Sequence, residues 1–223
     1  MPTFYVSPFL ESEKDVNDTP FGPKLNDPPR TYRDLYAQDL YEQYKTAQGR
    51  KEFAKRRRKL EADLAELETL LNDPKRDRER VMSLSFGLNG LIVQQEDIPL
   101  LIKIIRTART MRGPGSNNAE TYTSEVLIQI ADEDTLPFWV ESFRFARARD
   151  GFAKKRRKYA IRGAAVMALL HHNKEAIDLL IEGINHKNVK TREDTFRAVS
   201  EVKEIVKRPM PPRLTEALSD ALR

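Results

Sequence analysis

Apolar side chains recur every three or four residues along most of the chain, and the clearest example lies between residues 50 and 72. The stripe there consists of Phe53, Arg57, Leu60, Leu64, Leu67 and Leu71. Positions with this spacing share one face of an α-helix. A coiled coil would need the pattern over three or four heptads, and Arg57 interrupts it. Because this helix ends at Asn72-Asp73-Pro74 and a second begins at once, we interpret the two as a helical hairpin.

The same unit recurs at intervals of 38 or 39 residues. Glu96-Asp97-Ile98-Pro99 matches Asp134-Thr135-Leu136-Pro137, and each places an acidic residue three positions before a proline. Proline is tolerated in the first turn of a helix, because its missing N–H has no partner there. A third start, Asn173-Lys174-Glu175-Ala176, has alanine in the proline position. The repeats predict four helix pairs and a last capping helix, at 50–72 with 76–93, 96–110 with 118–131, 134–149 with 155–170, 173–185 with 189–206, and 211–222.

The second helices of the pairs share a further pattern. Residues 161–169, Ile-Arg-Gly-Ala-Ala-Val-Met-Ala-Leu, align with residues 191–199, and both have small residues where neighbouring helices must approach closely. This pattern of hydrophobic-Arg-x-x-Ala-x-x-Ala-Leu after a short turn resembles the inner helix of HEAT repeats, including the HEAT-like subset named after phycobilisome lyases. Leu70-Leu71-Asn72-Asp73-Pro74 followed by Arg80-Val81 resembles the turn of another such repeat, whereas residues 119–131 keep only the apolar period. The resemblance covers residues 50–206 and implies an all-α fold, an α-solenoid of about four HEAT-like helical pairs.

Two shorter segments precede the repeats. Residues 1–30 contain six prolines, which predict an extended N-terminal arm rather than a helix. We interpret it either as a solvated tail or as a peptide that docks on the solenoid or on a partner. Residues 31–49 predict a short amphipathic helix that runs to about Ala47, with Thr31 as its N-cap, Asp34 three residues on, and Gly49 as its terminator. The anchors for a docking arm are its apolar residues, Phe4, Tyr5, Phe9, Leu10 and Phe21.

The amino-acid composition excludes several classes of function but does not identify one. Hydrophobic residues make up 39% and charged residues 33% of the 223 positions, a balance that suits an elongated array with much surface per residue. The absence of cysteine excludes disulfides, thiolate catalysis and cysteine-ligated metals. No apolar run approaches the roughly 20 residues that cross a bilayer. The first 15 residues have no basic region followed by a long apolar stretch, so we expect no secretory signal and a cytoplasmic location.

Patterns that carry catalysis are absent from the sequence. His171, His172 and His186 lack the spacing of a metal site, and no nucleophile elbow, Walker loop or dinucleotide fingerprint is present. The glycine-rich stretch at 113–118 has no following lysine and is interpreted as a flexible loop between helices. Residues 132–134 supply three carboxylates, which a turn and an N-cap explain. We therefore expect a protein that is not an enzyme and needs no cofactor and no metal.

Basic residues gather where the first helix of each pair turns into the second. These turns stack along one edge of a solenoid, so the cations predict a basic edge that binds an acidic protein partner or tracks phosphates. Lysine and arginine late in a helix also complement its dipole, which is the alternative explanation. Our first hypothesis is a scaffold that binds a protein partner through the solenoid surface and the arm; the second is binding to a nucleic-acid backbone. The basic-edge residues are Arg106, Arg109, Arg112, Arg147, Arg149, Lys154, Lys155, Arg156, Arg157, Lys187 and Lys190.

Overall fold

The computed structural model describes residues 31–35, 44–73, 75, 77–88, 90, 92–110, 114–144 and 152–221. In these residues all regular structure is helical, and no strand is present. Three short 3-10 helices are η2 (Arg33–Leu35), η3 (Gln95–Asp97) and η4 (Glu133–Thr135). The α-helices are α2 (Ala47–Asn72), α3 (Arg78–Phe86), α4 (Ile98–Thr110), α5 (Pro114–Gln129), α6 (Leu136–Arg144), α7 (Ala153–His171), α8 (Lys174–Ile184), α9 (Val189–Val206) and α10 (Pro212–Asp220).

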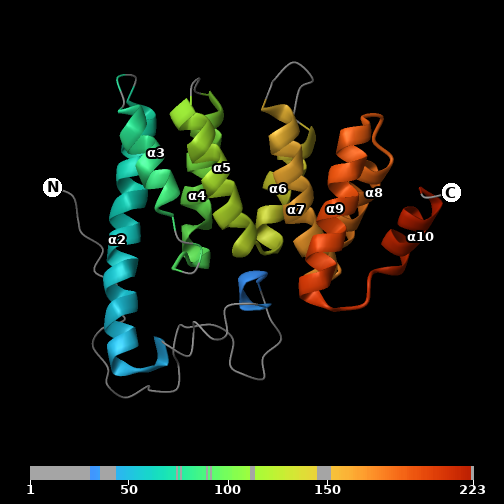
Figure 1. Cartoon of the computed structure of the whole chain (residues 1–223), viewed down its shortest axis with the longest axis horizontal. Helices are drawn as coiled ribbons and strands as arrows, with labels where there is room; N and C mark the ends of the chain where they lie inside the picture. The colour runs from blue at the N-terminus through green and yellow to red at the C-terminus, as the bar shows by residue number, and fades with distance from the viewer. Residues whose placement is uncertain are drawn as a thin grey trace.

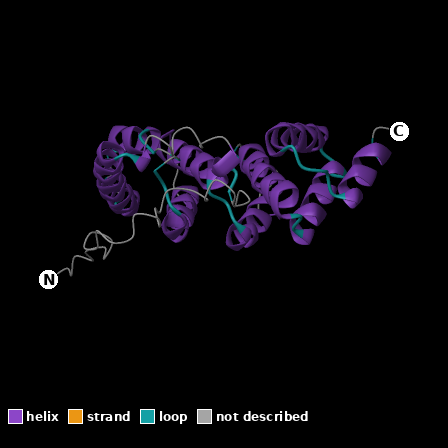
Figure 2. Cartoon of the chain, turned by 90° about the horizontal axis from the view of Figure 1, so that it is seen from below, coloured by secondary structure: helices purple, strands orange, loops and turns teal. Residues whose placement is uncertain are grey.

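The α-helices stand side by side, from α2 at one end of the molecule to α10 at the other (Figure 1). Helices α3, α5, α7 and α9, which we call the second row, pack against one another in that order, and α2, α4, α6 and α8 each pack against the second-row helix that follows them. We call α2, α4, α6, α8 and α10 the first row. Seen from below, the helices form one elongated array (Figure 2). Most packing is therefore between near neighbours in the sequence.

Local capping signals explain where most helices begin. Helices α4 and α6 start 38 residues apart, at Ile98 and Leu136, and each follows a 3-10 turn. The carboxylate of Asp97 accepts a hydrogen bond from the Gln94 amide, and that of Asp132 accepts one from the Asp134 amide. Helix α9 spans the predicted residues 189–206. The predicted spacing of 38 residues between the starts of α4 and α6 is thus confirmed. Such starts can be predicted because each cap lies within three residues of the helix that it begins.

Three predicted boundaries differ from the structure by three residues or more. Helix α3 ends at Phe86 rather than 93, where Gly87 follows as its C-cap. Helix α5 begins at Pro114 rather than 118, so most of the glycine-rich stretch predicted as a loop forms its first turn; proline suits that position because its missing N–H costs nothing there. Helix α2 begins at Ala47 with Thr46 as its N-cap, so Gly49 lies in its first turn and ends no preceding helix. The predicted end of α6 at 149 lies outside the described residues.

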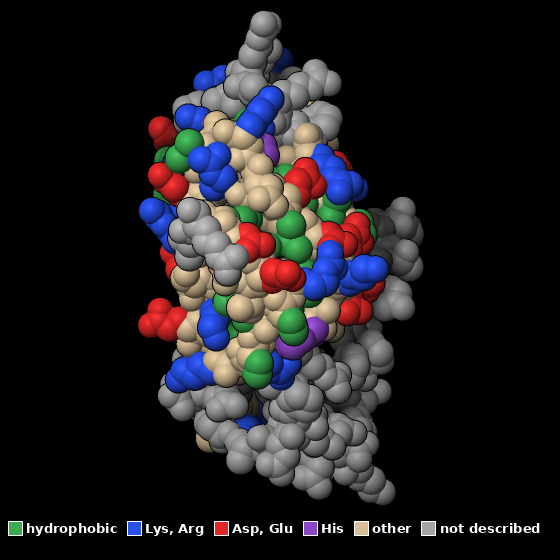
Figure 3. All heavy atoms as spheres, turned by 90° about the vertical axis from the view of Figure 1, so that its right-hand side faces the viewer, with side chains coloured by type: hydrophobic (Ala, Val, Ile, Leu, Met, Phe, Trp, Pro, Cys, Tyr) green, Lys and Arg blue, Asp and Glu red, His purple; other side chains and the backbone are tan. Residues whose placement is uncertain are grey.

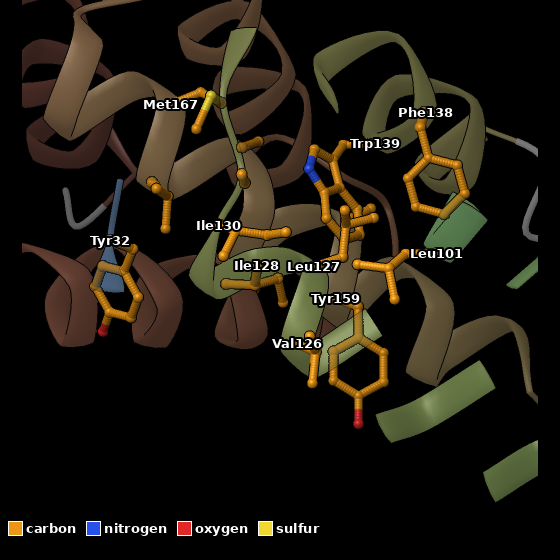
Figure 4. Close-up of a cluster of buried hydrophobic side chains, with 14 of the residues drawn as sticks. Tyr32, Leu101, Val126, Leu127, Ile128, Ile130, Phe138, Trp139, Tyr159 and Met167 are labelled. Carbon is orange, nitrogen blue, oxygen red and sulfur yellow. The ribbon is translucent and has the colours of Figure 1, made fainter. Parts of the chain in front are cut away.

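Buried apolar side chains from every α-helix in the described ranges form one continuous core. Its largest fully buried members include Trp139 of α6, Leu127 of α5 and Met167 of α7, which lie together between these three helices (Figure 4). Complete burial of a side chain of this size stabilises the fold by about 1.5–3 kcal/mol. The leucine stripe of α2 belongs to the same core, since Leu60, Leu64, Leu67 and Leu71 are buried. The stripe therefore packs within this chain, as the hairpin interpretation predicts.

Candidate binding surface

One edge of the molecule is formed by the ends of successive helices (Figure 1). The C-terminal ends of α2, α4, α6 and α8 and the N-terminal ends of α3, α5, α7 and α9 lie along that edge, at the top of Figure 1. The described basic-edge residues sit in the adjoining helix turns, as the repeat pattern predicts. Arg112, Arg147 and Arg149 lie outside the described residues, and so do the arm residues Phe4, Tyr5, Phe9, Leu10 and Phe21.

Two of the basic-edge arginines bind one buried carboxylate. Arg109 of α4 donates its Nε–H to Glu120 Oε1 at 2.9 Å, and Arg156 of α7 donates to both oxygens of Glu120 at 2.7 and 3.0 Å. Glu120, on α5, is 2% exposed, and the two arginine side chains are 11% exposed. Arg109 also donates to the Ser142 hydroxyl of α6 at 2.8 Å. This cluster ties four helices together, so both guanidinium groups face into the protein.

The electrostatics of this cluster depend on the shared carboxylate. Burial lowers the pKa of Arg109, and the charge of Arg156 adds to that effect, while Glu120 opposes it. The Arg109 guanidinium also lies 4.9 Å from the centre of the Phe138 ring, a distance typical of a cation–π contact. Because the two arginines have one carboxylate and an aromatic face as partners, their role in this structure is to hold α4, α5, α6 and α7 together.

Exposed cations of the first row pair with the next helix in the row. Lys103 of α4 pairs with Glu68 of α2, and Arg106 of α4 pairs with Glu141 of α6. Further along, Arg144 of α6 lies 3.6 Å from Glu182 of α8, and Arg213 of α10 lies 2.8 Å from Asp178 of α8. These four ion pairs link all five first-row helices in order. Because they are exposed, each contributes little on its own.

Four predicted basic-edge lysines are exposed at the surface. Lys154 and Lys155 lie in the first turn of α7, and Lys187 and Lys190 lie at the start of α9. Lys155 lies 5.2 Å from the centre of the Phe152 ring, and Lys190 pairs with Glu193 and Asp194, each at 3.3 Å. At the α10 end of the molecule, basic side chains are interspersed with acidic ones around small apolar areas (Figure 3). That face is therefore neither uniformly basic nor uniformly acidic.

A second surface crosses the second row of helices. The ring of Phe86 on α3 packs at a tilt against the ring of Tyr122 on α5, with ring centres 4.2 Å apart and 43° between the ring planes. One turn further along α5, Glu125 accepts a hydrogen bond at 2.9 Å from the Tyr159 hydroxyl of α7. Arg162, one turn beyond Tyr159, lies 4.0 Å from a carboxylate oxygen on α9. We name this set the second-row surface; its residues are Phe86, Tyr122, Glu125, Tyr159, Arg162 and Glu201.

One end of the second-row surface is already occupied by the chain itself. Tyr32 is 5% exposed; burial is the main cause that raises the pKa of its hydroxyl, the charge of Arg162 on α7 opposes that rise, and the charge of Glu201 on α9 adds to it. The turn around it is closed by Thr31 and Asp34, since the Thr31 amide donates to the Asp34 carboxylate at 2.8 Å and the Asp34 amide donates back to the Thr31 hydroxyl at 3.3 Å. These two hydrogen bonds are the ones expected of a cap at Thr31, but residues 36–43 of the helix predicted to follow it lie outside the described residues.

The next residue anchors this turn to a distant loop. Arg33 donates hydrogen bonds to the backbone carbonyl of Gly90, at 2.9 Å, and to that of Val93. Both carbonyls lie in the connection between α3 and α4, about 60 residues along the chain from Arg33. The Thr31–Leu35 turn therefore joins the α3–α4 connection to helices α7 and α9. The sequence predicts a cap at Thr31 but not the place where this turn packs, because no local pattern marks Arg162 or Glu201 as its neighbours.

The opposite end of the second-row surface is apolar and open. Phe86 is 57% exposed and Met82, one turn earlier on α3, is 36% exposed. These are two of the four large apolar side chains that are exposed in the described part of the chain. Apolar side chains of this size at the surface, when they gather, mark sites of interaction with another chain.

The described residues contain no group of three or more His, Asp or Glu side chains arranged to hold a metal ion. His186 lies in the turn before α9, with its Nδ1 accepting a hydrogen bond from the Asn188 amide at 3.0 Å. His171 is the last residue of α7, and His172 follows as its left-handed C-cap. No described helix is both long and apolar enough to cross a membrane.

No protein-family model, curated protein or solved structure matches this chain. The chemistry of the surfaces described above therefore carries the functional proposal.

Proposed function

We propose that the chain is a HEAT-like α-solenoid of four helix pairs that acts as a non-enzymatic protein-interaction scaffold. In this proposal the second-row surface binds an extended segment of a partner protein. The pairing of each first-row helix with the second-row helix that follows it supports the solenoid. The observation that carries the binding role is the Thr31–Leu35 turn, a short peptide with a single 3-10 turn, whose Tyr32 is buried within electrostatic reach of Arg162 on α7 and Glu201 on α9.

The chemistry of the second-row surface suits a peptide with an apolar side chain and a polar backbone. Phe86 and Tyr122 offer two aromatic rings in contact, which contribute to binding through the apolar area that a partner buries. Glu125 and Arg162 lie further along the same surface and supply an acceptor and a donor. A partner that also reaches the edge would meet the exposed Lys154 and Lys155, so we propose an acidic segment beside its apolar anchor.

A capture experiment with charged variants tests this proposal. The tagged chain, the variant Phe86→Glu and the control Val189→Glu are each incubated with nuclease-treated extract of the native source. Val189 has the same exposed fraction as Phe86, 57%, but lies at the start of α9. We expect a protein that is retained by the parent chain and by the control and is lost with Phe86→Glu. Equal retention by all three would remove the second-row surface from the proposal.

Binding of a phosphate backbone is the second candidate function, and the start of α7 favours it. Its N-cap residue, Phe152, makes no side-chain capping hydrogen bond, its first turn contains no acidic residue, and Lys154 and Lys155 are exposed there. Backbone N–H groups and lysines together suit phosphate oxygens. The test is the affinity for mixed-sequence DNA or RNA across a salt series, with Lys154→Glu/Lys155→Glu as the variant. Affinity that falls steeply with salt and is lost in the variant supports this function; no binding at low salt rejects it.

A further inference from the structure

An exposed apolar patch lies close to the point where the N-terminal arm joins the described structure. The patch consists of Met82 and Phe86 on α3 and Tyr122 on α5, with the two aromatic rings 4.2 Å apart. Apolar area left in water at such a patch favours any segment that covers it. A segment of the same chain can cover this patch if it is long enough to reach it.

The anchored turn brings the arm to this patch. Arg33 is hydrogen-bonded to the carbonyl of Gly90, and Gly90 follows Phe86 by only four residues. Four residues span at most about 14 Å of extended chain. Thr31, the residue to which the arm is joined, therefore lies close to the end of α3 that carries Phe86. A segment tethered at this range has an effective local concentration in the millimolar range for a short flexible link.

The arm also has a side chain at a suitable distance. Phe21 lies ten residues before Thr31, and ten residues reach up to about 35 Å when extended. This length lets Phe21 arrive at Phe86 and Tyr122 with chain to spare. Three further apolar anchors of the arm, Phe4, Tyr5 and Phe9, lie much nearer the N-terminus, so Phe21 is the aromatic residue with the shortest tether.

Charge favours the same arrangement. The arm contains five acidic and three basic residues and so has a net charge of −2. The whole chain has a net charge of +5, so the remaining residues together carry +7. Arg78, Met82 and Phe86 are spaced four residues apart and so share one face of α3. Arg78 is exposed at the basic-edge end of that face, about 12 Å from Phe86 by helix rise. The acidic residues of the arm that precede Phe21 are Glu11, Glu13, Asp15 and Asp18.

We infer that residues 1–30 bind back onto α3 and α5 of the same chain, with Phe21 against Phe86 and Tyr122 and the acidic residues directed to Arg78 and the basic edge. An arm held there covers the open, apolar end of the second-row surface. It therefore competes with a partner segment for Phe86 and Tyr122. The inference concerns the free chain and does not depend on the proposed scaffold function.

Site-specific photocrosslinking in the full-length chain tests this inference. The photoreactive residue p-benzoylphenylalanine replaces Phe86, which is exposed and so tolerates the change, and the control carries it at Val189, which is equally exposed on α9. The purified proteins are illuminated, digested and examined by mass spectrometry. We expect several-fold more cross-links from position 86 than from position 189 to peptides of residues 1–30, with Phe21 at or next to the main site. Adding Phe21→Ala to the position-86 protein should reduce this yield.

Mixing isotopically light and heavy chains separates the possible occupants. Cross-links within one isotope support the self-docked arm. Mixed-isotope cross-links that dominate and grow with protein concentration would show that a second copy covers the patch, and would overturn the inference. A yield to residues 1–30 no greater from position 86 than from position 189 would also overturn it. Because no partner is present, neither result affects the scaffold proposal.

Discussion

Gly163 of α7 lies directly against the indole ring of Trp139 on α6. A methyl group at position 163 would lie 2.5 Å from Cε2 of that ring, which is far inside contact distance. The ring cannot move aside easily, because it is fully buried and its Nε1–H donates to the Thr135 hydroxyl at 3.1 Å. Only glycine allows α6 and α7 to approach this closely.

We therefore expect Gly163→Ala to destabilise the protein by about 1–3 kcal/mol, the usual cost of overpacking a core. In an open helix the same change would stabilise by about 1 kcal/mol, so the sign of the effect reports the contact with Trp139. Chemical denaturation measures it. Gly87→Ala is the control, because the nearest atom there is 3.4 Å away and the backbone φ of −75° suits alanine. A stabilised Gly163→Ala protein would contradict the packing described here.

Removing the charge of Glu120 should be far more damaging than removing that of an exposed carboxylate. Glu120→Gln leaves the buried guanidinium groups of Arg109 and Arg156 without their shared anion, and we expect a loss of about 3–5 kcal/mol in the free energy of unfolding. The matched control is Glu66→Gln, since Glu66 also binds two nitrogens of one arginine, Arg80, at 2.6 Å but in an exposed pair. Urea unfolding should show little change for the control. Equal losses would mean that burial of Glu120 is not what matters.

Loss of the Arg33 side chain should release the Thr31–Leu35 turn without unfolding the helices. Arg33→Gln removes the donor to the carbonyls of Gly90 and Val93. We expect faster amide hydrogen exchange in residues 31–35 and 90–93, with unchanged exchange in α8 and α9. Arg50→Gln is the control, because Arg50 donates only locally, to the Lys45 carbonyl, at the exposed start of α2. Protection of residues 31–35 that survives Arg33→Gln would show that Tyr32 alone holds the turn.

Acid should weaken the fold at His186. Burial lowers the pKa of this imidazole below its ordinary value of 6.5, and the charges of Arg157 and Lys187 lower it further. The unfolded chain then binds more protons than the folded one, so this residue makes the free energy of unfolding fall as the pH drops below about 6.5. A ring-proton NMR titration checks the pKa. Arg157→Gln should raise the pKa, and His186→Gln should remove this part of the pH dependence.

The sequence predicted the starts of α4, α6 and α8 to within two residues, because a cap and its helix lie within a few residues of each other. The partners of Arg57 show where this reasoning stops. The periodicity places Arg57 on the buried stripe of α2, where it looks like an interruption. In the structure it forms a two-point ion pair with Asp97, which also caps the turn before α4. A contact 40 residues away leaves no mark on local periodicity.

The binding surfaces were predicted less completely for the same reason. The sequence places Arg109 and Arg156 at one edge, yet it gives no sign that Glu120 lies between them, because α5 lacks the repeat's arginine and alanine positions. Phe86 was also missed as a surface residue, since the prediction continued α3 to residue 93 and so assigned it to the interior of a helix. Tertiary packing, rather than any local pattern, determines both results.

An array in which each helix touches mainly its neighbours tends to melt from its ends in steps, since each boundary between neighbouring helices can open separately. The Thr31–Leu35 turn alters that behaviour, because a single peptide joins the α3–α4 connection to α7 and α9 and so spans several such boundaries at once. Opening any of them while the turn stays bound would strain the peptide. The turn thus links these helices and makes the unfolding of the middle of the array more cooperative.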